Sequence, residues 1–244
     1  MVLWLRRRRL LWSILAALAT LLLTLLLTGR QTRPTAVGGE ISSPGTVIVL
    51  DAGHGGEDGG AVSPDGVPES GINLQIVRKT EGLLVFLGRS VRLTRTGEEA
   101  IYSPEAQTLR EKKVSDLKNR VALINALPHA VLLSIHQNSM PQHPAVHGAQ
   151  VFSNPQEPAA GLAQSIQQAL NLTVNTGNEK TAKAIGDSVY LMKHITCPGV
   201  LVECGFLSNP DEAALLATEG YREQLAQAIG LGILAGLGKF DERS

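Results

Sequence analysis

The stretch Val47–Ala61, VIVLDAGHGGEDGGA, constrains the fold of this chain more than any other feature. It begins with four apolar residues and passes at Asp51 into a loop that contains five glycines and His54. A short β-branched run that ends abruptly in glycine is typical of a buried strand and its exit turn. Glycine also lets the backbone come close to whatever His54 faces. Such a loop could bind a phosphate, flank a metal ion or simply turn the chain.

Phosphate-binding motifs do not fit this loop. A dinucleotide fingerprint counted from Gly53 requires glycine at position 58, where the chain has Asp58. A P-loop counted from Gly55 is followed by Ala61 instead of lysine. A carboxylate facing a bound phosphate would also be repulsive. The loop therefore remains a candidate for a metal site or a plain turn.

Length and charge narrow the class of protein. A chain of 244 residues can form one domain with a large core, or two small ones. The formal charge is balanced, with 22 basic and 22 acidic residues, but Arg6–Arg9 supply four of the positive charges and no acid precedes Glu40. The chain from Leu10 onward is therefore slightly acidic, which argues against a nucleic-acid-binding protein. Two cysteines are too few for a disulfide framework.

The N-terminal segment has the pattern of an export signal. Arg6–Arg9 precede an uncharged run from Leu10 to Thr28, close to the roughly 20 apolar residues that span a bilayer as a helix. We expect residues 1–29 to be an uncleaved signal anchor with its arginines in the cytoplasm, and a cleaved signal is the alternative. Residues 30–45 are rich in Thr, Pro and Gly and predict a flexible linker. The rest would then lie in the cell envelope, tethered to the membrane.

From Thr46 onward, strand-like and helix-like stretches alternate. The predicted strands are Val47–Leu50, Val91–Thr94, Ala130–Ile135, Gln150–Ser153, Ser188–Met192 and Val200–Val202. The predicted helices are Gly71–Leu87, Val114–Leu127, Glu157–Leu170, Asn209–Thr218 and Gly220–Leu237. This order predicts a single α/β domain with a mostly parallel central sheet flanked by helices on both faces. The polar segment 98–113 is expected to be a long loop or lid.

Three predicted strands are each followed by an unusual polar residue. His54 follows the first strand, His136 follows Ala130–Ile135, and Glu203 follows the strand that ends at Val202. Ligands bind at the carboxyl ends of the strands in open α/β sheets. If the three strands are parallel, we therefore expect these side chains at the same edge of the sheet.

Two imidazoles and a carboxylate suit a zinc ion (Zn2+), which in catalytic sites has three protein ligands. Glu69 is the best candidate for the third ligand because it lies between the His54 loop and the next helix. Glu203 would then act as general base and acid. Alternatively, Glu69 is a first-turn helix acid and Glu203 a paired buried acid. His194 is a candidate for contact with the substrate or a ligand.

Six motifs carry a resemblance to a known family. They are LDAGHGGEDGGA (50–61), ExxxNL (69–74), LTR (93–95), RVALIN (120–125), SIHQNS (134–139) and VECGFLSNPDE (202–212). The chain resembles the zinc-dependent N-acetylmuramoyl-L-alanine amidases of the amidase-3 type over about residues 46–238, which would be the catalytic domain before a tail at 239–244. Ser139 and Cys204 depart from the usual pattern, but neither is at a ligand position.

The resemblance implies one zinc ion held by His54, Glu69 and His136, with Glu203 as the catalytic residue. The implied reaction is hydrolysis of the amide between N-acetylmuramic acid and L-alanine of peptidoglycan. Further candidates for substrate binding or for support of the ligands are Asp58, Asn73, Arg95 and Asn138. Segments 109–121 and 187–194 resemble the spore-cortex subgroup, which removes stem peptides so that muramic δ-lactam can form.

Two other functions remain open on the sequence. The chain could be a membrane-tethered module that binds peptidoglycan or regulates its turnover, with an inert zinc site. It could also be a zinc carboxypeptidase that releases D-alanine from the stem. An activator protein is a candidate partner in addition to peptidoglycan and the membrane.

Overall fold

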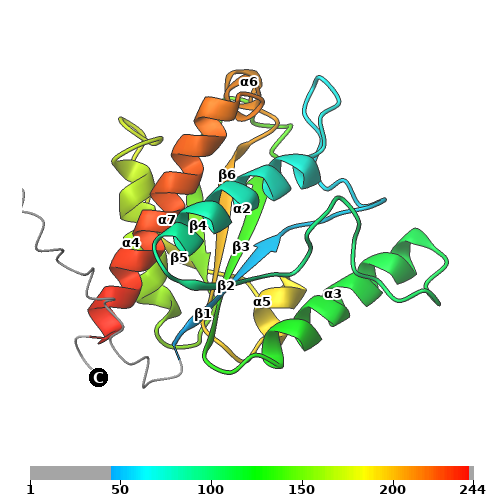
Figure 1. Ribbon diagram of the computed structural model, residues 1–244. Helices are drawn as coiled ribbons and strands as arrows, with labels where there is room; N and C mark the ends of the chain where they lie inside the picture. The colour runs from blue at the N-terminus through cyan, green and yellow to red at the C-terminus, as the bar shows by residue number, and fades with distance from the viewer. Residues whose placement is uncertain (1–44, 242–244) are drawn as a thin grey trace, which may run out of the picture. The chain divides into compact units, whose positions relative to one another are not determined.

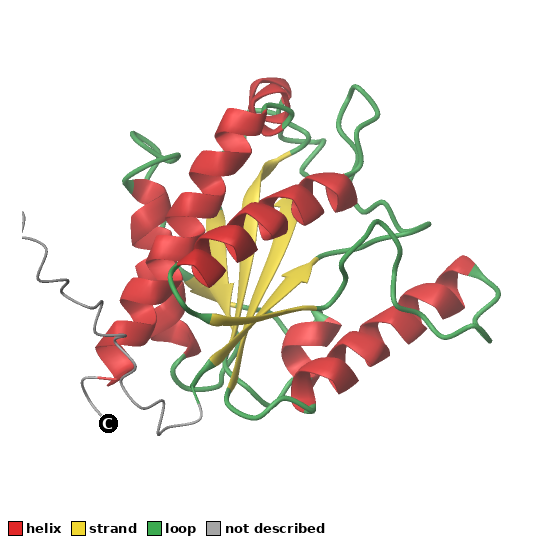
Figure 2. Ribbon diagram, in the orientation of Figure 1, coloured by secondary structure: helices red, strands yellow, loops and turns green. Residues whose placement is uncertain are grey.

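The computed structural model describes residues 45–241, with side chains to residue 238. These residues form a six-stranded sheet with helices on both faces (Figures 1 and 2). The strands are β1 (Val47–Ala52), β2 (Ser90–Leu93), β3 (Ala130–Asn138), β4 (Gln150–Ser153), β5 (Lys183–Ala184) and β6 (Gly199–Phe206), in the spatial order β2-β1-β3-β6-β4-β5. The helices are α2 (Glu69–Phe86), α3 (Leu109–Asn125), α4 (Ala159–Asn171), α5 (Tyr190–His194), α6 (Pro210–Leu216) and α7 (Glu219–Asp241).

The sheet is mixed, although its centre is parallel. Strand β1 pairs in parallel with β2 and β3, and β3 pairs in parallel with β6. Strand β4 is antiparallel to β6, and β5 pairs in parallel with β4. The connection from β3 to β4 has no helix, so β4 returns in the opposite direction without the crossover that a parallel neighbour requires. The expectation of a mostly parallel sheet is thus confirmed for the strands beside the polar residues and wrong for β4.

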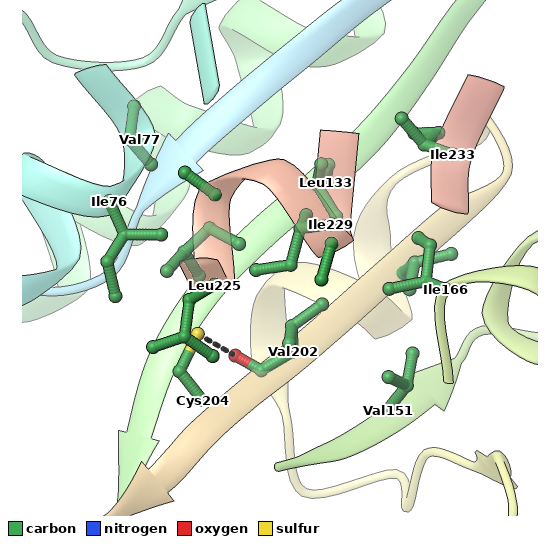
Figure 3. Packing of buried hydrophobic residues seen from close by; sticks show 14 of the residues in the cluster. Ile76, Val77, Leu133, Val151, Ile166, Val202, Cys204, Leu225, Ile229 and Ile233 are labelled. Carbon is green, nitrogen blue, oxygen red and sulfur yellow. Dashed lines mark hydrogen bonds between the residues drawn. The ribbon is translucent and has the colours of Figure 1, made fainter. Parts of the chain in front are cut away.

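The two faces of the sheet carry different helices. Alternate strand residues such as Leu133 and Val202 face α2, α4, α6 and α7, where Ile166, Ile229 and Ile233 fill the core (Figure 3). Cys204 lies in the same core. The residues between them, such as Val49 and Leu132, pack with residues of α3 and α5. Helices α3 and α5 therefore cover the face to which Asp51, Ser134 and His136 also belong.

Two predicted elements differ from the structure. Ser188–Met192 was expected to be a strand, but Tyr190–His194 forms helix α5, because buried Leu191 and Met192 pack with Ile195 beneath α3. A short apolar run does not distinguish the two states by its pattern alone. The loop expected over 98–113 ends at Thr108, whose side chain and Glu111 form a capping box that starts α3 at Leu109.

The predicted signal anchor (1–29) and most of the predicted linker (30–45) lie outside the described residues. Among residues 45–241, no helix is long and apolar enough to cross a membrane.

Candidate functional site

His54, Glu69 and His136 converge at the carboxyl ends of β1 and β3. His54 lies on the loop after β1, Glu69 is the first residue of α2, and His136 is near the end of β3. Each offers one ligand atom, and these atoms lie within 4.8 Å of one another. Glu69 Oε1 is 3.2 Å from His54 Nε2 and 3.2 Å from His136 Nδ1. The three residues expected from the sequence are therefore brought together in a geometry that could hold a metal ion.

Glycines make room for two of these side chains. A Cβ on Gly53 would lie 2.2 Å from Cε1 of His136, which is far inside van der Waals contact. Gly60 has φ +70°, and a Cβ there would lie 2.4 Å from Cγ of Glu69. The glycine-rich loop therefore wraps closely around the side chains that reach the site.

Hydrogen bonds fix the Glu69 carboxylate. Its Oε2 accepts from the Ala61 amide at 2.7 Å, and its Oε1 accepts from Asn73 Nδ2 at 3.2 Å. Asn73 also donates to the Gly53 carbonyl, so it links α2 to the loop after β1. Burial opposes ionisation of Glu69, but hydrogen bonds to His136 and His54 hold its pKa well below the usual range. Glu69 is therefore an anionic and oriented oxygen donor.

Asp58 orients His54 from the other side of the ring. Asp58 Oδ2 lies 2.9 Å from His54 Nδ1, and Lys113 Nζ lies 2.9 Å from Asp58 Oδ1. Because an ionised carboxylate only accepts, Nδ1 is the donor and Nε2 faces Glu69. Burial opposes both charges, but this bond lowers the pKa of Asp58 to about 2, and bonds to Asp58 and Glu69 raise the pKa of His54 to about 9. A carboxylate behind a histidine is the usual support of a metal ligand.

Glu203 lies beside His136 across the sheet. The two residues are partners in the register of β3 and β6. Oε2 of Glu203 is buried and has no hydrogen-bond partner within the described residues. Burial raises the pKa of the Glu203 carboxyl, and the charges of His136, Glu69 and His54 also act on it. An unpartnered carboxylate oxygen next to the three converging side chains is suited to accept and return a proton.

A cleft of about 220 Å³ opens above His54 and His136, between α3 and α5. Lys113 and Leu117 line it from α3, and Tyr190 and Leu191 line it from α5. Tyr190 was not among the site residues predicted from the sequence. His194, which was predicted, is exposed and stacks on the Tyr190 ring at 3.9 Å between centroids without lining the cleft. The four-residue spacing of the two rings, had this segment been recognised as helical, could have identified the pair.

The other two candidates have local roles in the structure. Asn138 ends β3, and its Oδ1 accepts from the Ser139 amide at 2.8 Å. Arg95 is buried and donates to the backbone carbonyls of Ala52, Gly53, Ser70 and Gly97. Burial lowers the pKa of Arg95 to about 10.

A buried ionic cluster beneath the loop was not expected from the sequence. Arg120 Nη1 donates to Asp51 Oδ1 at 2.6 Å, and its Nε donates to Asp116 Oδ2 at 2.8 Å. Thr94 and Ser134 donate to Asp51 at 2.7 and 2.6 Å. Although burial opposes ionisation, Arg120 and these hydroxyls lower the pKa of Asp51 to about 2. Two features of the sequence could have indicated this cluster: an acid directly after a buried strand, and an arginine within the apolar spacing of RVALIN.

The family of the chain follows from comparison with known proteins. The Amidase_3 model, described as N-acetylmuramoyl-L-alanine amidase, matches residues 48–235. The chain belongs to this family. The germination-specific N-acetylmuramoyl-L-alanine amidase of Bacillus subtilis strain 168 is 33% identical over 190 residues, which cover 78% of this chain and 79% of that protein.

Solved amidase structures share the fold. The CwlD amidase from Clostridioides difficile, in complex with the GerS lipoprotein, is 38% identical with a TM-score of 0.75, and the match covers 79% of this chain and 98% of that one. The catalytic domain of CwlV from Bacillus (Paenibacillus) polymyxa var. colistinus is 29% identical with a TM-score of 0.66, covering 79% and 98%.

The amidase-3 resemblance, including its similarity to the spore-cortex subgroup, is therefore confirmed. The protein is an enzyme, an N-acetylmuramoyl-L-alanine amidase that acts on peptidoglycan. This disfavours both the inert binding module and the carboxypeptidase.

Proposed function

We propose that this amidase is zinc-dependent and removes stem peptides from spore-cortex peptidoglycan, as a step towards muramic δ-lactam. Family membership supplies the reaction class. The metal, the residue roles and the cortex setting are our inference. The observation that carries it is the convergence of His54, Glu69 and His136 within 4.8 Å, beside the unpartnered oxygen of Glu203.

The side chains of His54, Glu69 and His136 would suit zinc as ligands. Two imidazole nitrogens and one carboxylate oxygen are a common ligand set of catalytic zinc, which leaves a further position open. Asp58 would hold His54 in the ligating orientation, and Asn73 would hold Glu69. When bound, zinc supplies a Lewis acid for the scissile carbonyl and lowers the pKa of the attacking water.

Glu203 is the residue that moves the proton. Its carboxylate takes a proton from the attacking water as the new C–O bond forms. It then gives that proton to the nitrogen of L-alanine as the C–N bond breaks, so that the leaving group departs as an amine. The raised pKa of Glu203 and its free buried oxygen support this role.

The remaining candidates would act around these four residues. We assign Asp58 and Asn73 to orientation of the ligands and Arg95 to the backbone of the His54 loop. Asn138 would border the substrate at the end of β3. His194 would contribute through the Tyr190 ring that it stacks on, instead of touching the ligands.

The setting of the reaction is inferred from the relatives and from the N-terminal sequence. Residues 1–29 would anchor the chain in the membrane, 30–45 would be the linker, 46–238 the catalytic domain outside the membrane, and 239–244 a tail. The complex of C. difficile CwlD with a lipoprotein supports an activator protein for this amidase as well. Activity of the pure chain that no envelope protein increases would contradict the activator.

Mass spectrometry of digested peptidoglycan tests the reaction. The zinc-loaded full chain is expected to release stem peptides from intact glycan strands, and a chelator is expected to stop the release. Unchanged muropeptides would indicate a binding module, and released D-alanine would indicate a carboxypeptidase. For the cortex role, spores lacking their own cortex amidase should regain muramic δ-lactam when this chain is expressed, and unchanged cortex would contradict that role.

A further inference from the structure

The backbone that carries His54 has an unfavourable local conformation. His54 has φ 60°, in the left-handed region that residues with a side chain seldom adopt. Gly55 and Gly56 follow with positive φ as well. Such a conformation persists only where the surroundings enforce it. The direction of the His54 ring therefore depends on what holds this loop.

Two arginines hold three successive carbonyls of the loop. Arg95 donates from Nε to Ala52 O at 2.9 Å and from Nη2 to Gly53 O at 3.2 Å. Arg120 donates from Nη1 to Ala52 O at 2.7 Å and from Nη2 to His54 O at 2.7 Å. The carbonyls of residues 52, 53 and 54 are thus all bound by guanidinium groups that arrive from different elements.

Both arginines are buried, and their remaining hydrogen bonds also go to groups of the protein. Arg95 is 3% exposed and Arg120 is 1% exposed. The remaining bonds of Arg95 go to the carbonyls of Gly97 and Ser70, and those of Arg120 go to Asp51 and Asp116. Only the planar fork of arginine reaches several acceptors in fixed directions, and a lysine ammonium cannot reproduce that geometry.

We propose that Arg95 and Arg120 are positioning residues that hold the His54 loop in its metal-binding conformation, an inference that rests on the zinc site proposed above. They act through the backbone, whereas Asp58 acts on the His54 ring. This gives a function to the LTR and RVALIN motifs, from which no zinc ligand is drawn. The loop is held in place before the metal arrives, so that zinc affinity depends on both arginines.

The test compares Arg95→Lys with Arg78→Lys in the full chain. Arg78 is a matched control because it donates to the Thr96 carbonyl and pairs with Glu81, so it binds the same segment after β2. Within the described residues it donates to none of the carbonyls of 52–54. Zinc affinity is measured by competition with a chromogenic chelator, and thermal unfolding is measured for the metal-free and zinc-loaded forms.

Arg95→Lys should weaken zinc binding about 10–100-fold, the usual effect of losing a group that supports a ligand. Its zinc-loaded form should lose more thermal stability than its metal-free form, and Arg78→Lys should keep zinc affinity within about twofold of wild type. Wild-type affinity in folded Arg95→Lys overturns the proposal, as does an equal loss in Arg78→Lys.

If Arg95→Lys does not fold, Arg120→Lys is measured and interpreted in the same way. Failure of both variants to fold also overturns the proposal, because the arginines would then serve the whole fold instead of the metal site. A wild-type chain that binds no zinc refutes the zinc site itself. A wild-type chain that binds zinc, together with an unaffected Arg95→Lys, refutes only the role of the arginines.

Discussion

Replacing Gly53 with alanine should damage the proposed metal site through a single steric contact. The new Cβ would lie 2.2 Å from Cε1 and 2.3 Å from Nε2 of His136, whereas ordinary contacts begin near 3.4 Å. The backbone of Gly53 does not require glycine on conformational grounds, because its φ is not in the positive range. The imidazole would therefore have to move by about 1 Å, a misplacement that can cost on the order of 100-fold in rate.

The effect of Gly53→Ala on zinc affinity and activity should be distinguishable from a general loss of folding stability. Overpacking costs about 1–3 kcal/mol of folding stability, which still permits a folded variant to be purified. Zinc affinity by chelator competition and kcat/KM on a muropeptide substrate should both fall about 100-fold. Gly71→Ala is the control, because a Cβ there meets nothing within 4 Å although Gly71 lies two residues from Glu69. Zinc affinity and kcat/KM within twofold of wild type in Gly53→Ala would refute the reasoning.

Three further results are expected. Glu203→Gln should keep zinc but lose at least about 100-fold in kcat, as removal of a general base does, and full activity would exclude the assignment. Asp58→Ala should weaken zinc binding about 10–100-fold, because it removes the acceptor that orients the His54 ring, and unchanged affinity in chelator competition would contradict that role. Ser134→Ala should destabilise the protein by about 1.5–3 kcal/mol in urea unfolding at neutral pH, because it removes a hydrogen bond to ionised Asp51. The folded-state pKa of Asp51 is lowered from 3.8 to about 2, so the destabilisation by Ser134→Ala should be present above pH 4 and disappear as the pH falls through 2. A destabilisation that persists below pH 2 would mean that the loss comes from packing instead.

The central part of the fold could be predicted because it follows from local patterns. The strands that precede His54, His136 and Glu203 are short apolar runs that end in polar residues, and their parallel pairing brings them together at one edge. The antiparallel direction of β4 was missed, although the sequence carries a signal for it: no helix is predicted between Ala130–Ile135 and Gln150–Ser153, and a parallel neighbour requires a crossover connection.

The proposed ligands were easier to pick out in the sequence than the residues that hold them in place. His54 and His136 stand out as polar residues at the ends of apolar strands. The bonds by which Arg95 and Arg120 hold the loop go to backbone carbonyls, which no side-chain pattern in the sequence indicates. The error at 187–194 has a similar origin. The five residues of α5, two of them buried, have the pattern of a short strand, and Tyr190, which lines the cleft, was not among the predicted site residues.

Titration of zinc into the metal-free full chain, with amide cleavage followed in the same samples, tests the central claim most directly. Activity should rise in proportion to bound metal and stop rising at about one zinc ion per chain. His136→Ala, which removes one of the three proposed ligands, should bind little zinc and remain inactive at the same concentrations. Full activity without metal, or undiminished zinc binding in His136→Ala, would contradict the account.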